Sequence, residues 1–223
     1  MKTLYNGHEP VYHRIKAEGC VGWDKTEEAY RERESELERI LGNGLAPARG
    51  RVLELGCGAG NISIWLARRG FDVRGVDIAP AAIDWAREKA QKESVAASFT
   101  LGNVLELGHL EEATADFVLD GHCLHCIIAE DRKIFLATAF RLLVPGGYLL
   151  IDTMCGPVVG GHLEGYDPAL KMILYHDAAI RYFGMPEEIQ EEISAAGFTI
   201  LNVDLRREAG HGNMFVEARK PLD

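Results

Sequence analysis

Three glycines and a downstream aspartate have the spacing that most directly implies ligand binding. Gly56, Gly58 and Gly60 follow a short apolar run. Asp77 ends a second apolar run, 17 residues after the last of these glycines. Glycines let the main chain approach a ligand closely, and a carboxylate in this position can accept both hydroxyls of a ribose. The pattern predicts a nucleoside site, although a dinucleotide fingerprint would need glycine at Asn61.

A second group of reactive side chains is the run His-Cys-Leu-His-Cys at residues 122–126. A structural zinc site would need a second pair of ligands, and the sequence has no further Cys-x-x-Cys. His162, His176 or Cys155 could complete a site only if folding brought them there. We therefore expect no metal centre, and we interpret the five cysteines as reduced thiols.

The composition excludes several classes of function. Hydrophobic residues make up 47% and charged residues 26% of the 223 residues, which is typical of a globular protein. The net charge of −10 argues against tight binding to nucleic acid. No apolar run approaches the ~20 residues that span a bilayer, and the start of the sequence lacks a signal-peptide core. We expect a cytoplasmic protein with a small-molecule partner and no membrane contact.

Alternating apolar and amphipathic stretches must position these residues. The expected strands are 51–55, 71–76, 97–101, 115–120 and 148–153. The expected helices between them are 61–69, 80–92 and 131–143. This alternation predicts crossover connections and a parallel sheet that is covered by helices on both faces.

The two ends of the chain carry weaker patterns. Residues 1–23 are expected to be irregular, and Asp24 with Glu27 resembles a capping box before a surface helix at 25–41. Within that helix, Arg31, Glu32, Arg33 and Glu34 are expected to form a solvated face.

Beyond the Pro145-Gly146-Gly147 turn and the strand that follows it, the pattern changes. Residues 154–185 are expected to be loop-rich with a short helix near 170–182, and a helix should follow at 186–196. Strands at 198–205 and 214–218 should pair antiparallel, because the turn between them is too short for a crossover. The predicted fold class is α/β, a doubly wound and mostly parallel sheet in one domain.

Four segments resemble a known family. The first is Val52-Leu53-Glu54-Leu55-Gly56-Cys57-Gly58-Ala59-Gly60 followed by Gly75-Val76-Asp77. It resembles the cofactor motifs of class I S-adenosylmethionine-dependent methyltransferases. Residues 116–127 resemble the family's fourth-strand motif, and residues 140–151 resemble its Pro-Gly-Gly turn and fifth strand. Residues 185–198 are similar to small-molecule members. The resemblance implies seven strands in the order 3-2-1-4-5-7-6, with the last strand of the sequence antiparallel.

The resemblance also implies a site for S-adenosylmethionine, whose product is S-adenosylhomocysteine. The implied cofactor-binding residues are Glu54, Gly56, Cys57, Gly58, Gly60, Asn61, Asp77, Ile78, Asn103, Val104 and Asp120. Asp77 would hold the ribose, and it could also cap the helix that starts at Pro80. Ile78 would pack on the adenine. Asn103 stands where the family usually has an acid, and its amide oxygen can accept the same hydrogen bond.

By the same resemblance, residues 1–223 form a single methyltransferase domain. Its parts would be an N-terminal arm and helix (1–41), a cofactor-binding core (50–153), a substrate-side insertion (154–185) and a C-terminal helix and strand pair (186–219). The substrate-side candidates are Tyr12, His13, Trp23, His162 and His176. Tyr12 and Trp23 could equally be ordinary packing residues of the arm.

Methyl transfer from a sulfonium is an in-line displacement, and holding the reacting atoms in line supplies much of the acceleration. A base is needed only for a protonated acceptor, and histidine suits that task with an unperturbed pKa near ~6.5. His122 is the first candidate. His125 is the second, although it could instead hold its turn by a buried hydrogen bond.

The expected function is methyl transfer to an O, N or S atom of a small molecule. The alternatives are a methyltransferase acting on protein or RNA and a module that binds S-adenosylmethionine without catalysis. The sequence lacks an Asn-Pro-Pro-Tyr-like motif after the fourth strand, which argues against amide or base methylation.

Overall fold

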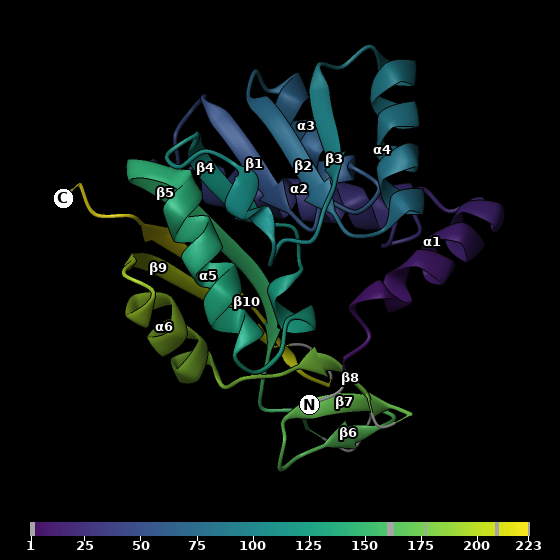
Figure 1. Cartoon of the computed structure of the whole chain (residues 1–223), viewed down its shortest axis with the longest axis vertical. Helices are drawn as coiled ribbons and strands as arrows, with labels where there is room; N and C mark the ends of the chain where they lie inside the picture. Colours follow the sequence, from purple (N-terminus) through teal and green to yellow (C-terminus); the bar gives the residue numbers. More distant parts are fainter. Residues whose placement is uncertain (1–2, 160–162, 177, 208–209, 223) are drawn as a thin grey trace.

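A seven-stranded sheet in the order β3-β2-β1-β4-β5-β10-β9 forms the centre of the molecule (Figure 1). The structure is a computed structural model, and it describes residues 3–159, 163–176, 178–207 and 210–222. The strands of the sheet are β1 Arg51–Leu55, β2 Asp72–Asp77, β3 Ala97–Leu101, β4 Ala115–Asp120, β5 Leu143–Cys155, β9 Thr199–Arg207 and β10 Gly212–Arg219. Strands β1 to β5 are parallel, and β10 is antiparallel to both of its neighbours. The predicted fold class and strand order are confirmed.

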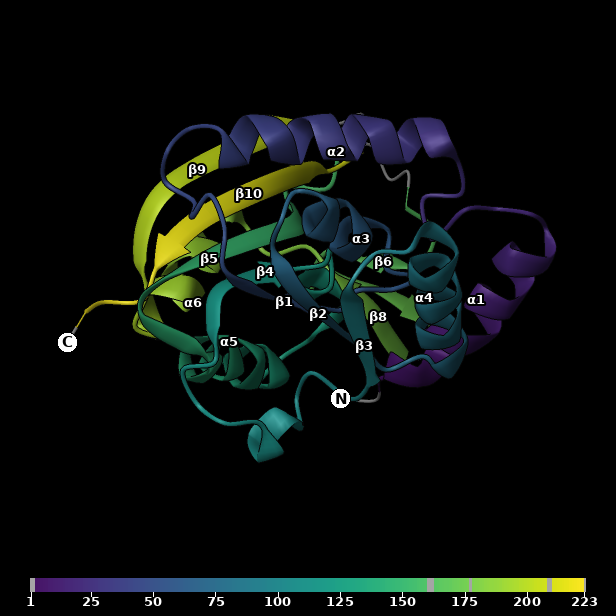
Figure 2. The same ribbon diagram turned by 90° about the horizontal axis from the view of Figure 1, so that it is seen from above.

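Residues alternate between the two faces of this sheet, and each face is covered by helices. Leu53, Val118 and Ile151 pack with α5 (Asp131–Leu142) and α6 (Pro186–Ala195). On the other face, Val52 and Leu119 belong to a cluster with α2 (Glu27–Leu41) and α3 (Asn61–Arg68). Figure 2 shows α2 and α3 on one side of the sheet and α5 on the other. No helix among the described residues is long and apolar enough to cross a membrane.

Proline and glycine residues mark the start of helix α4 and an irregular stretch of strand β5. Pro80 opens α4 (Pro80–Glu93) at its first turn, as expected. The turn expected at Pro145-Gly146-Gly147 is instead a bulged part of β5: Ala115 pairs with Leu143, whereas Phe117 pairs with Tyr148. The extra residues fit into the strand because they bulge away from β4.

The expectation of an irregular N-terminus is wrong. A short 3-10 turn at Tyr5–Gly7 leads into helix α1 (His8–Ala17), which buries Tyr12 and Ile15. Pro10 is compatible with this helix because it lies in the first turn, where backbone N–H groups have no helical partner. The capping prediction is also wrong by two residues. Thr26, and not Asp24, accepts a hydrogen bond from the Ala29 N–H at the start of α2.

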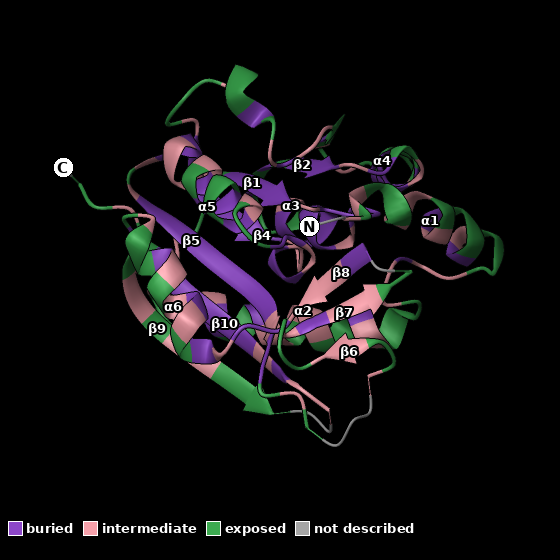
Figure 3. Cartoon of the chain, turned by 60° about the horizontal axis from the view of Figure 1, so that its bottom comes forward, coloured by how far each residue is buried: buried purple, intermediate pink, exposed green. Residues whose placement is uncertain are grey.

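The helix expected near residues 170–182 is replaced by a second, antiparallel sheet, so the expectation of one sheet is wrong. Its strands are β6 Tyr166–Asp167, β7 Met172–Tyr175 and β8 Ala178–Tyr182. Ile173, Tyr175 and Ile180 favour strands because branched and aromatic side chains suit a pleated surface. In Figure 3 this sheet is mostly half-buried, whereas the central strands are buried. A parallel bridge between Thr3 and Ala179 joins it to the N-terminal arm.

Candidate functional site

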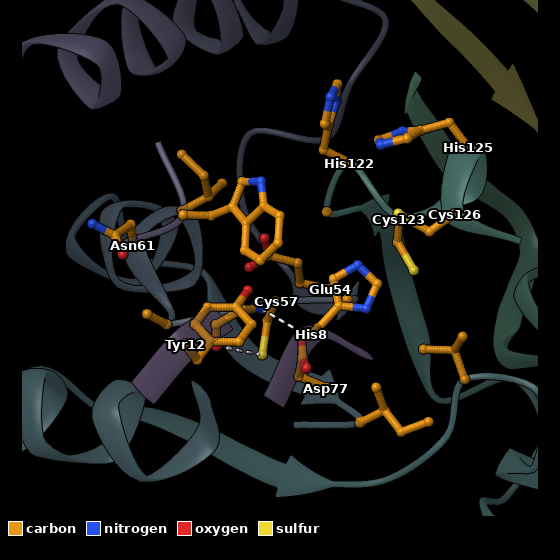
Figure 4. Close-up of a pocket in the computed structure, with 18 of the residues that line it drawn as sticks. His8, Tyr12, Glu54, Cys57, Asn61, Asp77, His122, Cys123, His125 and Cys126 are labelled. Carbon is orange, nitrogen blue, oxygen red and sulfur yellow. Dashed lines mark hydrogen bonds between the residues drawn. The ribbon is translucent and has the colours of Figure 1, made fainter. Parts of the chain in front are cut away.

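A pocket lies where β1, β2 and β4 end, at the edge where ligands of open α/β sheets bind (Figure 4). Helix α1 contributes His8 and Tyr12 to its wall, and β8 contributes Arg181. The pocket is lined by Tyr5, His8, Tyr12, Trp23, Asp24, Tyr30, Arg33, Glu54, Gly56, Cys57, Gly58, Ala59, Asn61, Ile62, Asp77, Ile78, Asn103, Val104, Gly121, His122, Cys123, His125, Cys126, Ile127, Met154 and Arg181. Most of the residues expected at the cofactor therefore meet in one place.

The glycine loop has no room for side chains. A Cβ atom on Gly56 would lie 2.5 Å from the Cβ atom of Cys123, and one on Gly58 would lie 2.5 Å from the Tyr12 hydroxyl. Both glycines have a positive φ, +77° and +52°. Gly60 has a different task, because its Cβ would meet Ala86 at 2.7 Å. It permits close helix packing and does not line the pocket.

Asp77 lines the pocket and is only 8% exposed. Its Oδ2 atom accepts a hydrogen bond from the Gly58 N–H at 2.8 Å, and its Oδ1 atom accepts one from the Ala79 N–H at 2.9 Å. Burial raises the pKa of Asp77, although these two bonds oppose the shift. Ala79, and not Asp77, is the N-cap residue of α4. Asp77 therefore ties the glycine loop to the end of β2.

Glu54 and Asn61 support the loop from behind. Glu54 is buried and accepts a hydrogen bond from the Ser63 hydroxyl. Burial raises the pKa of Glu54 to about 7. Asn61 donates to the Val21 carbonyl at 3.2 Å, which connects α3 to the segment before α2.

Asn103 and Asp120 each hold a turn. The Asn103 amide accepts from the Leu105 N–H at 3.0 Å and donates to Glu106 at 3.1 Å, and the residue lines the pocket beside Val104. The Asp120 Oδ1 atom accepts from the Cys123 and Leu124 N–H groups. Its Oδ2 atom is buried without a partner among the described residues, and burial raises the pKa of Asp120 to about 8. Asp120 does not line the pocket.

His122 combines a strained backbone with a buried carboxylate partner. Its φ is +62°, a conformation that costs of order 1–3 kcal/mol in a residue other than glycine and is typical of functional sites. Its Nδ1 atom lies 3.1 Å from the Oδ1 atom of Asp152, which also accepts from the Asn213 amide at 3.0 Å. The Nε2 atom has no protein partner among the described residues, so it is free to meet a ligand.

Asp152 and Arg33 are site residues that the sequence analysis missed. Asp152 is 1% exposed, and its Oδ2 atom pairs with the Arg33 guanidinium at 2.6 Å. Burial would raise the pKa of Asp152, but Arg33 and His122 lower it to about 2. The expectation that Arg33 lies on a solvated face is wrong. The spacing of Tyr30, Arg33 and Leu37 places it on the buried stripe of α2, and that signal could have found it.

His125 lies beside His122, with the two ring centroids 4.4 Å apart (Figure 4). It is 2% exposed, yet its Nδ1 atom has no hydrogen-bond partner among the described residues. The buried hydrogen bond that we expected from His125 is therefore not formed at Nδ1. Burial and the neighbouring His122 and Arg181 hold the pKa of His125 well below its usual value, so its ring is neutral at neutral pH.

The substrate-side candidates divide into two groups. Tyr12 and Trp23 line the pocket, and Trp23 packs between Tyr12 and His8 with ring centroids 5.3 and 5.4 Å away. His13 is exposed beside Glu9, and His176 lies against Tyr175 in the exposed turn after β7. Neither of these two histidines lines the pocket. His162 is outside the described residues.

The cysteines of the 122–126 segment line the pocket as thiols. Burial raises the pKa of Cys123 well above its usual value and that of Cys126 to about 11, so both are protonated at neutral pH. Within the described ranges, no three His, Cys, Asp or Glu side chains gather as metal ligands.

Comparisons with known proteins agree with this arrangement. Residues 53–151 match the family described as a methyltransferase domain. A ubiquinone biosynthesis O-methyltransferase of Azorhizobium caulinodans is 32% identical over 157 residues, which cover 69% of this chain and 61% of that protein. An S-adenosyl-L-methionine-dependent Diels-Alderase of Talaromyces variabilis is 35% identical over 114 residues, 49% of this chain and 38% of that protein. The matches thus span less than two thirds of either relative.

A solved structure extends the similarity over almost the whole chain. It is the 1,6-didemethyltoxoflavin-N1-methyltransferase of Burkholderia thailandensis, with bound 1,6-didemethyltoxoflavin and S-adenosylhomocysteine. The TM-score is 0.72 at 26% identity, and the alignment covers 98% of this chain and 87% of that one. The resemblance seen in the sequence motifs is thereby confirmed. This chain thus has a methyltransferase domain at residues 53–151, and it is similar in sequence and in fold to the class I S-adenosylmethionine-dependent methyltransferases.

Proposed function

We propose that this chain binds S-adenosylmethionine and transfers the methyl group to an O, N or S atom of a small molecule. One observation carries the proposal: a buried carboxylate beside the glycine loop, Asp77, and a carboxylate-held imidazole, His122, line the same pocket. Two relatives that are named for methyl transfer, an O-methyltransferase of ubiquinone biosynthesis and a 1,6-didemethyltoxoflavin-N1-methyltransferase, support a small acceptor.

The residues present fit the cofactor. Gly56 and Gly58 leave the loop without side chains, so a ligand can lie against the main chain. Each Asp77 oxygen accepts one backbone hydrogen bond and retains a second lone pair for a ribose hydroxyl. Ile78 and Val104 would hold the adenine between them. When bound, S-adenosylmethionine supplies an electrophilic methyl group on a sulfonium.

His122 is the base in this proposal. The carboxylate of Asp152 holds the Nδ1 side of the ring, so Nε2 can take a proton from a protonated acceptor. Arg33 keeps Asp152 ionised, so the proton remains on the imidazole. An acceptor that is already deprotonated needs no base, and the pocket would then act by alignment alone.

We further propose that residues 1–223 act as one domain in the cytoplasm. Residues 1–41 and 154–185 would cover the core of 50–153, and residues 186–219 would extend the sheet. The net charge of −10 disfavours RNA as the acceptor.

One experiment tests these alternatives together. S-adenosylhomocysteine is titrated into the protein by calorimetry, and S-adenosylmethionine with a labelled methyl group is then incubated with separated metabolite, protein and RNA fractions of a cell extract. We expect binding of the product and label in the metabolite fraction. Label in the protein or RNA fraction favours a macromolecular acceptor, and binding without transfer favours a module without catalysis. Absence of binding overturns the proposal.

A further inference from the structure

Arg181 on strand β8 is a charged pocket residue without a countercharge. Its guanidinium has no carboxylate within 4.0 Å among the described residues, and only Nη1 is engaged, with the Ile180 carbonyl at 2.8 Å. The other arginine that lines the described pocket, Arg33, is paired with Asp152. A guanidinium carries five N–H donors in a planar fork that matches a carboxylate. Most of the donors of Arg181 are therefore available to a ligand.

A second unsatisfied group lies next to it. His125 is on the turn η3 (Leu124–Cys126), which packs against β8, and its buried Nδ1 atom has no partner among the described residues. A buried polar atom without a partner costs about 1–3 kcal/mol, so native proteins rarely retain one without a reason. A ligand oxygen beside Arg181 would satisfy this nitrogen as well.

The carboxylates of the pocket do not compensate this charge. Asp77 and Glu54 are held by the glycine loop and by Ser63, and Asp152, which does not line the pocket, is paired with Arg33. Asp24, the third carboxylate of the lining, forms no ion pair with Arg181 within 4.0 Å. The pocket wall around Arg181 and His125 also includes apolar and aromatic side chains, namely Tyr5, Trp23, Ile127 and Met154. The arginine lies over the Trp23 ring, with its guanidinium carbon 6.0 Å from the ring centroid.

We infer that Arg181 and His125 form a subsite for a carboxylate on the methyl acceptor, so that the acceptor is a small organic acid. This inference rests on the proposed function. It specifies a monoanion because one unpaired guanidinium provides a single positive charge, and no lysine is among the described residues that line the pocket. The carboxylate would lie beside the proposed base, because the His122 and His125 ring centroids are 4.4 Å apart.

Calorimetry on the protein saturated with S-adenosylhomocysteine tests the subsite with sodium benzoate as the probe. We expect benzoate to bind with a Kd on the order of 1 mM, and neutral methyl benzoate to bind at least about tenfold more weakly. Arg181→Gln should weaken benzoate at least about tenfold while S-adenosylhomocysteine binds as in the wild type. Arg74→Gln removes an equal charge from an exposed position of β2 outside the pocket, and it should change neither affinity.

The contrary outcomes are distinct. Absence of saturable benzoate binding, equal binding of the ester, or unchanged benzoate affinity in Arg181→Gln would overturn the subsite. Inorganic phosphate that binds more tightly than benzoate would overturn the assignment to a carboxylate. Failure of the wild type to bind S-adenosylhomocysteine would instead count against the proposed function, and benzoate titration of the protein alone would still test the subsite.

Discussion

The Nδ1 atom of His122 lies 3.1 Å from the Oδ1 atom of Asp152, although the two residues are 30 positions apart in the chain. His122 follows β4 and Asp152 lies in β5, and these neighbouring parallel strands bring the two side chains together. Arg33 reaches the same carboxylate from α2. An imidazole at the edge of the pocket is thus held by a buried carboxylate that Arg33 keeps ionised.

Replacing that carboxylate should impair catalysis more than binding. In Asp152→Asn we expect kcat to fall by about 10²–10⁴-fold. The reason is that the carboxylate at Nδ1 orients the imidazole and fixes its tautomer, and an amide in its place need not do so. Affinity for S-adenosylhomocysteine should remain unchanged and serves as the control for folding. An unaltered kcat would show that Asp152 does not act through His122.

Asp77 should determine affinity for the cofactor. We expect Asp77→Asn to weaken S-adenosylhomocysteine binding by roughly 10–100-fold, because hydrogen bonds to a charged group contribute about 1.5–3 kcal/mol. Calorimetric titration measures this directly. Asp72→Asn, at the exposed start of the same strand, should bind as the wild type does. Equal affinities of the two variants would remove the ribose assignment.

The contribution of Glu54 and Asp120 to the stability of the fold should decrease as pH rises from about 4 to about 8. The pKa values of Glu54 and Asp120 are raised to about 7 and about 8, so the folded state retains protons that the unfolded state has already released. Protons bound in excess by the folded state make the free energy of unfolding fall with pH.

Urea denaturation at about pH 5 and about pH 8 measures this dependence. We expect Asp120→Asn to flatten it, since the amide does not titrate and can still accept the bonds from Cys123 and Leu124. Asp84→Asn, at an exposed position of α4, should keep the wild-type dependence. An equal slope in Asp120→Asn and the wild type would contradict the assignment.

Gly58 should tolerate no side chain while Tyr12 keeps its hydroxyl. Gly70 also has a positive φ, +88°, but its Cβ would meet nothing within 4 Å. We therefore expect Gly58→Ala to lose more stability than Gly70→Ala, by about 1–3 kcal/mol, because only the former overpacks. Adding Tyr12→Phe to Gly58→Ala should recover part of the loss, since the clashing atom is the hydroxyl. Thermal denaturation of these three variants, of Tyr12→Phe alone and of the wild type would reveal additive losses if the clash is absent.

The strands and helices of the core were predictable because their signals are local. Strands β1, β3 and β4 have the expected limits, since a glycine directly follows each of them. The glycine loop and Asp77 were recognisable for the same reason. The spacing of the glycines and Asp77 along the chain determines how these residues are arranged in the pocket.

The missed features depend on partners that are distant in the chain. Strand β8 needs its pairing with β7 and with Thr3, and Arg33 needs Asp152. Local periodicity carries no information on such pairs. Arg181 was missed because an expected helix would not have carried it to the pocket, whereas the small sheet does.

The bridge between Thr3 and Ala179 also has a kinetic consequence. It joins the N-terminal arm, which carries Tyr12, to the small sheet, which carries Arg181. Because both segments contribute to the pocket wall, we expect them to move together. Release of the spent cofactor and release of the methylated product would then require the same opening event. We expect any substitution that weakens the bridge between Thr3 and Ala179 to change the residence times of both ligands together.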